Sequence, residues 1–230
     1  RPRGPRPRRL RPSSHRLKKG RSVPDTWFIS GAAGFIGSHL ATHLLAGGEQ
    51  VVGFDNFTTG TRANIDRVAA AGGAAFRLIE GDIRDRQAVS AALTGVDRVV
   101  HLAAQVSVPK SIDDPHENDS VNVGGFLNVL TAAGGSGVRA MVYASSCAVY
   151  GDNADLPLVE DACPRPLSPY AASKLINEHY ASTLSARFPE MAVAGLRLFN
   201  IYGPWQGHEG GYASVIPKWL AKVSDPPAQS

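Results

Sequence analysis

The stretch Ser30-Gly31-Ala32-Ala33-Gly34-Phe35-Ile36-Gly37-Ser38-His39 follows an apolar run, residues 26–29, and leads into a helical pattern. This order predicts a strand, a phosphate-binding loop and a helix. Gly31 and Gly34 allow a tight turn and the close approach of a pyrophosphate, and Gly37 allows the helix to pack close to the strand. A dinucleotide is therefore the expected ligand, although the spacing is G-x-x-G-x-x-G in place of G-x-G-x-x-G.

A carboxylate follows the next apolar run, where a ribose-binding residue is expected. Residues 50–54 read as a strand, and Asp55 comes directly after them, eighteen residues beyond Gly37. A carboxylate at this place accepts hydrogen bonds from both ribose hydroxyls and repels a 2′-phosphate. The sequence thus predicts NAD as the cofactor in preference to NADP.

The composition is that of a globular protein with a basic N-terminal segment. The 230 residues are 43% hydrophobic and 19% charged, and no apolar run approaches the roughly eighteen residues that a membrane span needs. Residues 1–22 hold ten of the 24 Lys and Arg and no acid, so the remainder carries 14 basic against 20 acidic side chains, a net charge of −6. Nucleic-acid binding by the remainder is not indicated.

The basic segment and the rest of the chain are expected to behave differently. Residues 1–22 are rich in proline and poor in large apolar residues, so we expect a disordered tail there and one globular domain over residues 23–230. Cys147 and Cys163 have no metal-binding or redox spacing, which fits a reducing, cytoplasmic compartment. None of the seven histidines forms a metal-binding pattern, so no metal site is expected.

Apolar strands alternate with helical patterns along the chain. This alternation predicts a Rossmann-like doubly wound α/β fold, in which helices cover both faces of a parallel sheet. Ligands of such sheets bind at the carboxyl ends of the strands, so the residues directly after each strand are candidate site residues. The expected strands are 26–29, 50–54, 75–80, 98–102, 140–144 and 192–198, and helices are expected from 35 onward and at 85–93, 120–133 and 169–187.

A tyrosine and a lysine four residues apart carry the most specific chemistry. Tyr170 and Lys174 share one face of an expected helix, and Ser146 lies 24 residues before the tyrosine, after an expected strand. A nearby cation favours the phenolate, so we expect Lys174 to lower the pKa of Tyr170 and to make it a general base. The alternative, a core tyrosine beside a solvated lysine, is disfavoured because the pair accompanies a dinucleotide loop and a ribose carboxylate.

These motifs resemble the extended short-chain dehydrogenase/reductases, the family of nucleotide-sugar epimerases and dehydratases. The resemblance rests on GAAGFIG from Gly31, Asp55-Asn56, Gly81-Asp82-Ile83, HLAA from His101, Asn122, the segment from Ser146 to Gly151, Tyr170 with Lys174, and RLFNIYGP from Arg197. The likeness is greatest to the UDP-N-acetylglucosamine and UDP-glucose 4-epimerases, through SVPKSIDDP from Ser107, PLSPYAASK from Pro166 and GGYASVIPKW from Gly210.

The resemblance implies a role for each matching residue. Tyr170 would take the proton of the sugar 4-hydroxyl, Ser146 would hydrogen-bond that oxygen, and Lys174 would hold the cofactor ribose, which makes these three the catalytic residues. The implied cofactor-binding residues are Gly31, Gly34, Phe35, Ile36, Gly37, Asp55, Asn56, Asp82, Ile83, Leu102, Ala103, Ala104, Asn122, Tyr170, Lys174 and Phe199. The implied substrate-binding residues are Ser107, Ser146, Asn200 and Cys147, the last of which either contacts the sugar or fills space.

The expected reaction is NAD-dependent epimerisation at C4 of a UDP-sugar through a 4-keto intermediate. In the family's 4,6-dehydratases an Asp and a Glu follow the catalytic hydroxyl, whereas Cys147 and Ala148 stand here and cannot form that acid/base pair. Three alternatives stay open: a dehydratase or 4-keto-sugar reductase of the same family, a catalytically incomplete NAD-binding module, and a nucleic-acid-binding protein that uses the basic tail.

The resemblance also predicts the end of the chain and its assembly. Relatives continue beyond the position of residues 216–219 with most of the lobe that grips the nucleotide and sizes the sugar pocket. We therefore expect the small C-terminal substrate lobe to be largely missing, with only its start present at about residues 200–230. A homodimer through the helices at 120–133 and 169–187 is expected, because relatives pair through these helices.

Overall fold

The computed structural model of the chain describes residues 23–206 and 215–224. The expected disordered tail, residues 1–22, lies outside the described residues, and so does the first half of the GGYASVIPKW segment.

Six parallel strands form the sheet of the described chain, in the order β3-β2-β1-β4-β5-β6. The chain starts in the middle, builds outward to β3 and then crosses back to β4 beside β1. The strand order thus reverses between β1 and β4, where sheets of this kind bind ligands. The predicted Rossmann-like doubly wound fold is confirmed. The strands are β1 (Thr26–Ser30), β2 (Gln50–Asp55), β3 (Phe76–Glu80), β4 (Arg98–His101), β5 (Ala140–Ser146) and β6 (Ala192–Leu198).

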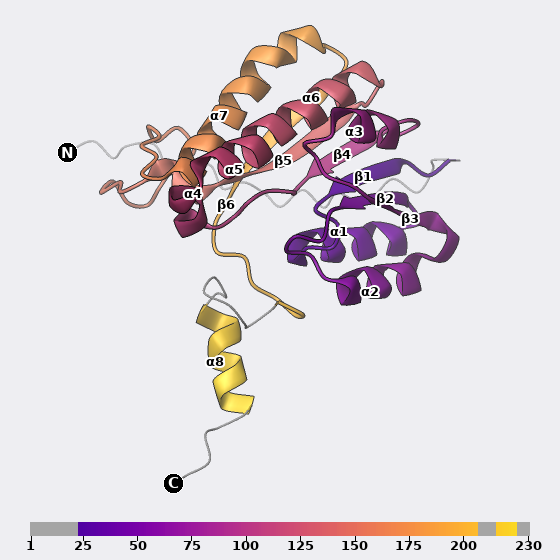
Figure 1. Ribbon diagram of the computed structural model, residues 1–230, viewed down its shortest axis with the longest axis horizontal. Coiled ribbons are helices and arrows are strands. Elements are labelled where there is room, and N and C mark those ends of the chain that lie inside the picture. The colour runs from indigo at the N-terminus through magenta and orange to yellow at the C-terminus, as the bar shows by residue number, and fades with distance from the viewer. Residues whose placement is uncertain (1–22, 207–214, 225–230) are drawn as a thin grey trace, which may run out of the picture.

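Helices cover both faces of the sheet (Figure 1). Two neighbouring residues of β1 show why the strand is apolar throughout: Phe28 packs into the core with α3 and α6, and Ile29 packs into the core with α1 and α2. Both side chains are fully buried, as in other parallel strands with two covered faces. One face carries α1 (Phe35–Ala46) and α2 (Arg62–Gly72), and the other carries α3 (Arg86–Ala92), α6 (Gly125–Gly135) and α7 (Pro169–Leu184).

The described chain contains four helices that the apolar pattern does not predict: α2, α4 (Val108–Asp113), α5 (Pro115–Asp119) and α8 (Val215–Ser224). Two of them are too short for a helical period to show. They begin instead at capping residues, because Ser107 accepts a hydrogen bond from the Lys110 N–H and Asp114 accepts one from the Glu117 N–H. No helix in the described ranges combines the length and the apolar character that crossing a membrane requires.

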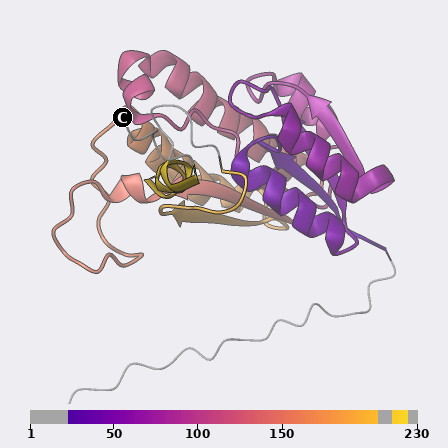
Figure 2. The same cartoon turned by 90° about the horizontal axis from the view of Figure 1, so that it is seen from below.

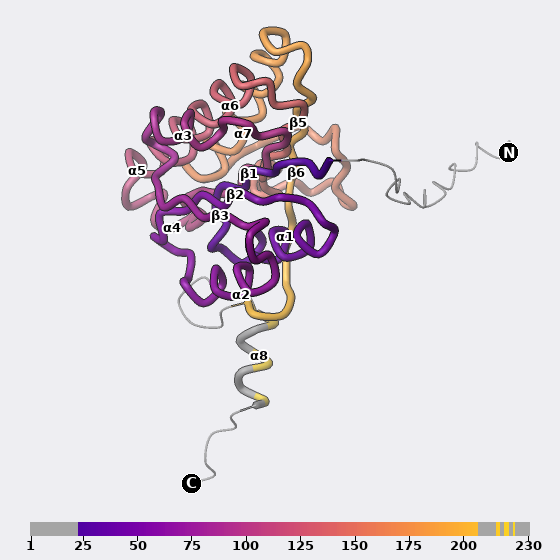
Figure 3. Tube along the Cα trace, turned by 90° about the vertical axis from the view of Figure 1, so that its right-hand side faces the viewer, coloured from indigo at the N-terminus to yellow at the C-terminus, as the bar shows by residue number. Residues whose placement is uncertain are grey.

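The chain leaves the sheet after β6 and runs past α1 and α2 toward α8 (Figure 3). Trp205 marks this passage: its ring centroid lies 5.0 Å from that of His39 in α1, and the Arg67 guanidinium of α2 lies 4.7 Å from the same ring. Helix α8 stands apart from the layers in Figure 1 and is seen end-on in Figure 2. The segment after β6 is therefore attached to the first half of the fold.

Candidate active site

The glycine loop between β1 and α1 is shaped for the close approach of an anion. Gly31 has a φ of +76°, and a Cβ added there would lie 2.8 Å from the backbone nitrogen of Ala103. A Cβ on Gly37 would lie 2.1 Å from the Gly31 carbonyl oxygen. No side chain of the described residues caps α1 at Gly34. The N–H groups of the first turn of α1, which begins with Phe35 and Ile36, are thus available to a phosphate.

Asp55 lies beside this loop at the end of β2 and is buried. Its Oδ2 accepts a hydrogen bond from the Ala33 N–H at 2.9 Å, and its Oδ1 accepts one from the Phe57 N–H at 2.8 Å. The carboxylate therefore fixes the glycine loop, a contact that the sequence pattern does not predict. Each oxygen keeps a further lone pair, which is what binding of ribose hydroxyls requires.

The residues after β3 form a charged pair next to Asn56. Asp82 accepts a hydrogen bond from the Asn56 amide at 3.0 Å and from the Arg84 guanidinium at 2.7 Å. The hydrogen bond from Arg84 is the main reason why the pKa of Asp82 falls to about 2. Ile83, which follows, is buried in the core. Asp82 is thus ionised and already paired.

The end of β4 meets the glycine loop through Ser30. The Ser30 carbonyl accepts a hydrogen bond from the Leu102 N–H at 3.0 Å, and its hydroxyl lies 2.7 Å from Nδ1 of His101. Burial, assisted by the charge of Lys174, lowers the pKa of His101 to about 3, so this imidazole is neutral. The segment after β4 therefore lies against the glycine loop and lines the site on that side, through Leu102, Ala103 and Ala104.

The structure brings the three expected catalytic residues together at the carboxyl end of β5. Ser146 ends β5, and its hydroxyl accepts a hydrogen bond from the Ala148 N–H at 3.1 Å. Tyr170 and Lys174 lie in the first turns of α7, which Ser168 caps through the Ala171 N–H at 3.1 Å. The side chains of Ser146 and Tyr170 are hydrogen-bonded. Lys174 is 3% exposed, and its Nζ donates a hydrogen bond to the Ala144 carbonyl at 3.0 Å.

The expected effect of Lys174 on Tyr170 is wrong for the chain by itself. Burial raises the pKa of Tyr170, and the hydrogen bond to Ser146 only partly opposes the rise. An electrostatic contribution from Cys147 adds to the rise. Burial also lowers the pKa of Lys174 to about 8. Desolvation of both groups therefore outweighs the attraction that the i, i+4 spacing suggested.

Asn122 supports this cluster from a π-helical turn, Ser120–Gly124, that precedes α6. Its amide nitrogen donates to the Ser173 hydroxyl at 3.1 Å and to the Gln105 carbonyl at 3.0 Å, and its backbone carbonyl accepts a hydrogen bond from Asn177 at 3.0 Å. The turn thus joins the segment after β4 to two residues of α7. Such turns occur frequently at functional sites.

The expected substrate-binding residues lie farther apart than the three expected catalytic residues. Ser107 is buried and uses its hydroxyl to cap α4. Asn200 is exposed beyond β6, and Phe199, an expected cofactor-binding residue, is 54% exposed, with its ring centroid 6.3 Å from that of Tyr150. The described residues therefore close the cofactor side of the site more than the substrate side.

An ion pair between Glu178 and Arg197 lies near the site and is not predicted from the sequence. Glu178 accepts two hydrogen bonds from Arg197, at 2.9 Å and 2.8 Å, and one from the Ser145 hydroxyl at 2.5 Å. These contacts tie α7 to β5 and β6, at the strand residue that precedes Ser146. The signal was available in part, because Glu178 follows Lys174 by four residues on the same helix.

Comparisons with known proteins agree with this geometry. The model of the NAD dependent epimerase/dehydratase family matches residues 27–228. A UDP-glucose 4-epimerase of Streptomyces lividans is 37% identical over 79% of this chain and 54% of its own length. The structure of UDP-N-acetylglucosamine 4-epimerase from Methanobrevibacter ruminantium is similar with a TM-score of 0.81 and 31% identity, covering 87% of this chain and 63% of that one.

A structure with another activity is also similar. DesIV, a dTDP-glucose 4,6-dehydratase from Streptomyces venezuelae, gives a TM-score of 0.77 and 35% identity over 87% of this chain and 62% of its own. The chain spans about half the length of the curated relatives that it matches. Solved relatives hold NAD, which agrees with the predicted cofactor. The chain belongs to the NAD dependent epimerase/dehydratase family.

Proposed function

We propose that the chain catalyses NAD-dependent epimerisation at C4 of a UDP-sugar through a 4-keto intermediate. The observation that carries the proposal is the arrangement of Ser146, Tyr170 and Lys174 at the carboxyl edge of the sheet, across from the glycine loop. A hydroxyl pair and a buried cation at the place where a dinucleotide binds fit a reaction in which a proton leaves a sugar hydroxyl and a hydride leaves the carbon that bears it.

The residues present fit NAD. The close contacts that a Cβ would make at Gly31 and Gly37 leave room only for backbone, so the first N–H groups of α1 would hold the pyrophosphate. Asp55 would bind the adenosine ribose and Lys174 the nicotinamide ribose. Bound NAD would supply reversible hydride transfer at C4 and a positive charge to the site.

Tyr170 has the task of removing the proton from the sugar 4-hydroxyl. Its hydrogen bond with Ser146 gives that proton a path and stabilises the phenolate. The backbone N–H of Ala148 holds the Ser146 hydroxyl in place. Because burial raises the pKa of Tyr170, the base forms only when further positive charge enters the site.

The proposed substrate side uses Ser107, Cys147 and Asn200, with the lobe starting at about residue 200. Support comes from Cys147, which lies close enough to Tyr170 to affect its pKa. We place the reaction in the cytoplasm, which agrees with the reducing compartment inferred from the two cysteines.

Dehydration is the nearest rival, because a dTDP-glucose 4,6-dehydratase is among the similar structures. The two residues after Ser146 argue against it. Cys147 and Ala148 lie in the 3₁₀ turn Cys147–Tyr150, so a thiol and a methyl group occupy the positions next to the catalytic hydroxyl. Neither of them serves as the carboxylic acid/base pair that elimination of water needs.

We also propose that two copies of the chain pair through α6 and α7, which cover the same face of the sheet. Apolar side chains on α7 support it: Ile176 is 38% exposed and Tyr180 is 37% exposed. Burial of such side chains against a second copy is favourable. Sedimentation of the purified chain tests the pairing, and a monomer at every concentration would contradict it.

The test of the proposed reaction is incubation of the purified chain with UDP-N-acetylglucosamine or UDP-glucose, with and without added NAD. Products are resolved by anion-exchange chromatography and proton NMR. The galacto epimer is the expected product. A 4-keto-6-deoxy sugar would establish a dehydratase instead, and bound NAD without any product would leave the chain as a cofactor-binding module.

A further inference from the structure

A cation, Arg62, stands at the ribose end of the proposed cofactor site. It is the first residue of α2, which starts two residues after Gly60. A Cβ on Gly60 would lie 3.0 Å from Oδ1 of Asp55, so the start of α2 is packed against the expected ribose-binding carboxylate. An arginine at this end of a dinucleotide site is a group that accommodates the 2′-phosphate of NADP.

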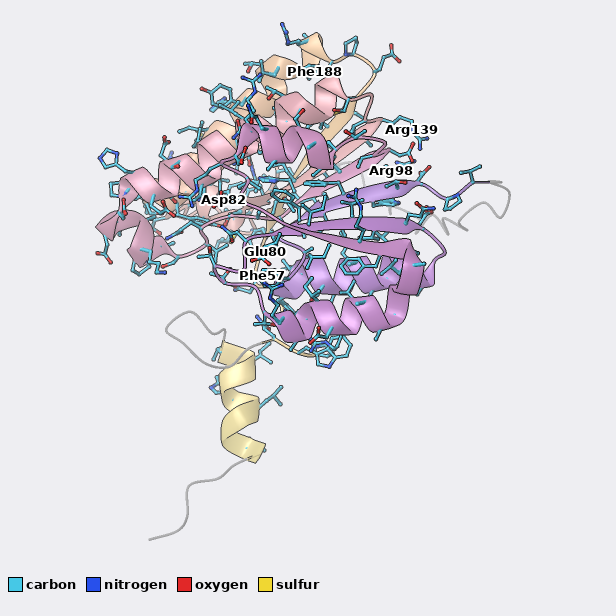
Figure 4. All side chains as sticks on the ribbon, turned by 45° about the vertical axis from the view of Figure 1, so that its right-hand side comes forward. Phe57, Glu80, Asp82, Arg98, Arg139 and Phe188 are labelled. Atoms are coloured by element: carbon cyan, nitrogen blue, oxygen red, sulfur yellow. The ribbon has the colours of Figure 1, made fainter. Side chains whose placement is uncertain are left out.

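Arg62 is held by two neighbours of Asp55. Its guanidinium donates a hydrogen bond to the Glu80 carboxylate at 2.5 Å and lies 3.6 Å from the centroid of the Phe57 ring. Phe57 and Glu80 appear side by side in Figure 4. Glu80 is the register partner of Asp55 between β2 and β3, and the Phe57 N–H donates to Asp55. The four residues thus form one closed set of contacts.

The backbone also favours this arrangement. Phe57 has a φ of +58°, a conformation that few residues other than glycine adopt. The hydrogen bond to Asp55 holds it there and turns its ring under Arg62. Cation and ring attract each other, so the guanidinium is fixed from one side by Phe57 and from the other by Glu80.

The second arginine near the ribose end is paired as well. Arg84 binds Asp82 at 2.7 Å and Glu117 at 2.9 Å. Arg62 is thus paired with one carboxylate and Arg84 with two, and Asp55 adds a further negative charge. We propose that Glu80 is a specificity-determining residue: it withholds Arg62 from the ribose 2′ position and so makes the site select NAD over NADP. The inference rests on the cofactor site proposed above.

The pair is weak enough to be broken by one substitution. The side chains of Arg62 and Glu80 are 60% and 58% exposed, and exposed ion pairs contribute little to stability. Removal of the Glu80 charge is thus expected to leave the fold intact and to free Arg62 for a phosphate. Glu80→Ala is needed beside Glu80→Gln, because the glutamine oxygen can still accept a hydrogen bond from Arg62.

The test is titration of the cofactor-stripped chain with NADH and NADPH, whose own fluorescence reports binding without turnover. Glu80→Gln and Glu80→Ala are expected to raise the affinity for NADPH about tenfold and to change that for NADH less than twofold. In the double variants with Arg62→Gln the gain should disappear. Glu190→Gln, which removes an exposed charge before β6, is the matched control and should change neither affinity.

Two results would overturn the inference. One is an unchanged NADPH affinity in both Glu80 variants while NADH still binds. The other is a gain that survives Arg62→Gln or that Glu190→Gln reproduces, because the effect would then be one of overall charge. If the unmodified chain binds neither NADH nor NADPH, the proposed cofactor site fails and the inference fails with it, whereas binding without epimerisation overturns only the proposed reaction.

Discussion

The Nζ atom of Lys174 lies 5.9 Å from the centroid of the Tyr170 ring, but its hydrogen bond is directed to the Ala144 carbonyl. Burial sets the charge of both groups, since it lowers the pKa of the lysine to about 8 and raises that of the tyrosine. At neutral pH the site therefore contains a buried ammonium and a neutral phenol. The general base proposed above would therefore need additional positive charge, which bound NAD would supply.

Tyr170→Phe should abolish turnover and keep cofactor binding. The variant loses only the hydroxyl that takes the proton, so we expect epimerisation to fall about 1,000-fold, with NADH affinity within twofold of the unmodified chain. Tyr180→Phe, on the same helix and 37% exposed, is the control and should keep full turnover. Product formation and NADH titration are measured on both. Ordinary turnover in Tyr170→Phe would end the assignment of this residue.

Lys174→Met should remove a pH dependence of stability. The pKa of Lys174 falls from 10.5 to about 8 on folding, so the unfolded chain binds more protons between these values and the free energy of unfolding rises with pH. We expect a gain on the order of 2 kcal/mol between pH 8 and 10 in the unmodified chain. Urea unfolding at each pH measures it.

The variant separates Lys174 from the other titrating groups. The raised pKa of Tyr170 and that of Tyr143, about 12, act in the opposite direction and mainly above pH 10. An equal gain between pH 8 and 10 in Lys174→Met would show that another group is responsible.

The fold could be predicted because its central strands, β1, β2 and β4, are largely buried on both faces. Residues such as Phe28 and Ile29 leave no polar alternation, so the parallel sheet is readable from short apolar runs. Helix α2 could not be predicted in this way, since its residues are mostly small or polar and its start depends on the Thr61 side chain, which accepts a hydrogen bond from the Asn64 N–H.

The candidate site could be located from sequence, but its electrostatics could not. Spacing placed Tyr170 and Lys174 on one helix face, and the structure places them near Ser146. The direction of the tyrosine pKa depends on burial, which spacing does not report. The hydrogen bonds of Asp55 to the glycine loop and of Glu178 to Arg197 depend likewise on contacts between distant segments.

Gly37→Ala should destabilise the glycine loop and prevent cofactor binding. The added Cβ would lie 2.1 Å from the Gly31 oxygen and 2.9 Å from the Ala32 Cα, which are backbone atoms that cannot move alone. We expect a loss of about 3 kcal/mol in the free energy of unfolding and no detectable NADH binding. Gly135→Ala is the control, because its Cβ meets nothing within 4 Å. Equal effects of the two substitutions would contradict the role of close packing at Gly37.

Trp205→Ala should release the segment after β6 from the cofactor-binding half. The Trp205 ring lies tilted against the His39 ring, with the centroids 5.0 Å apart, and the Arg67 guanidinium lies 4.7 Å from the Trp205 centroid. The His39 ring in turn lies 5.0 Å from that of Phe35, the first residue of α1. Loss of the ring contact and of the cation–π contact is expected to cost about 1–2 kcal/mol of unfolding free energy and to speed hydrogen exchange at residues 201–206. Trp219→Ala removes a ring that is 63% exposed and should leave both measurements unchanged. Slow exchange at residues 201–206 in Trp205→Ala would mean that other contacts hold the segment against α1.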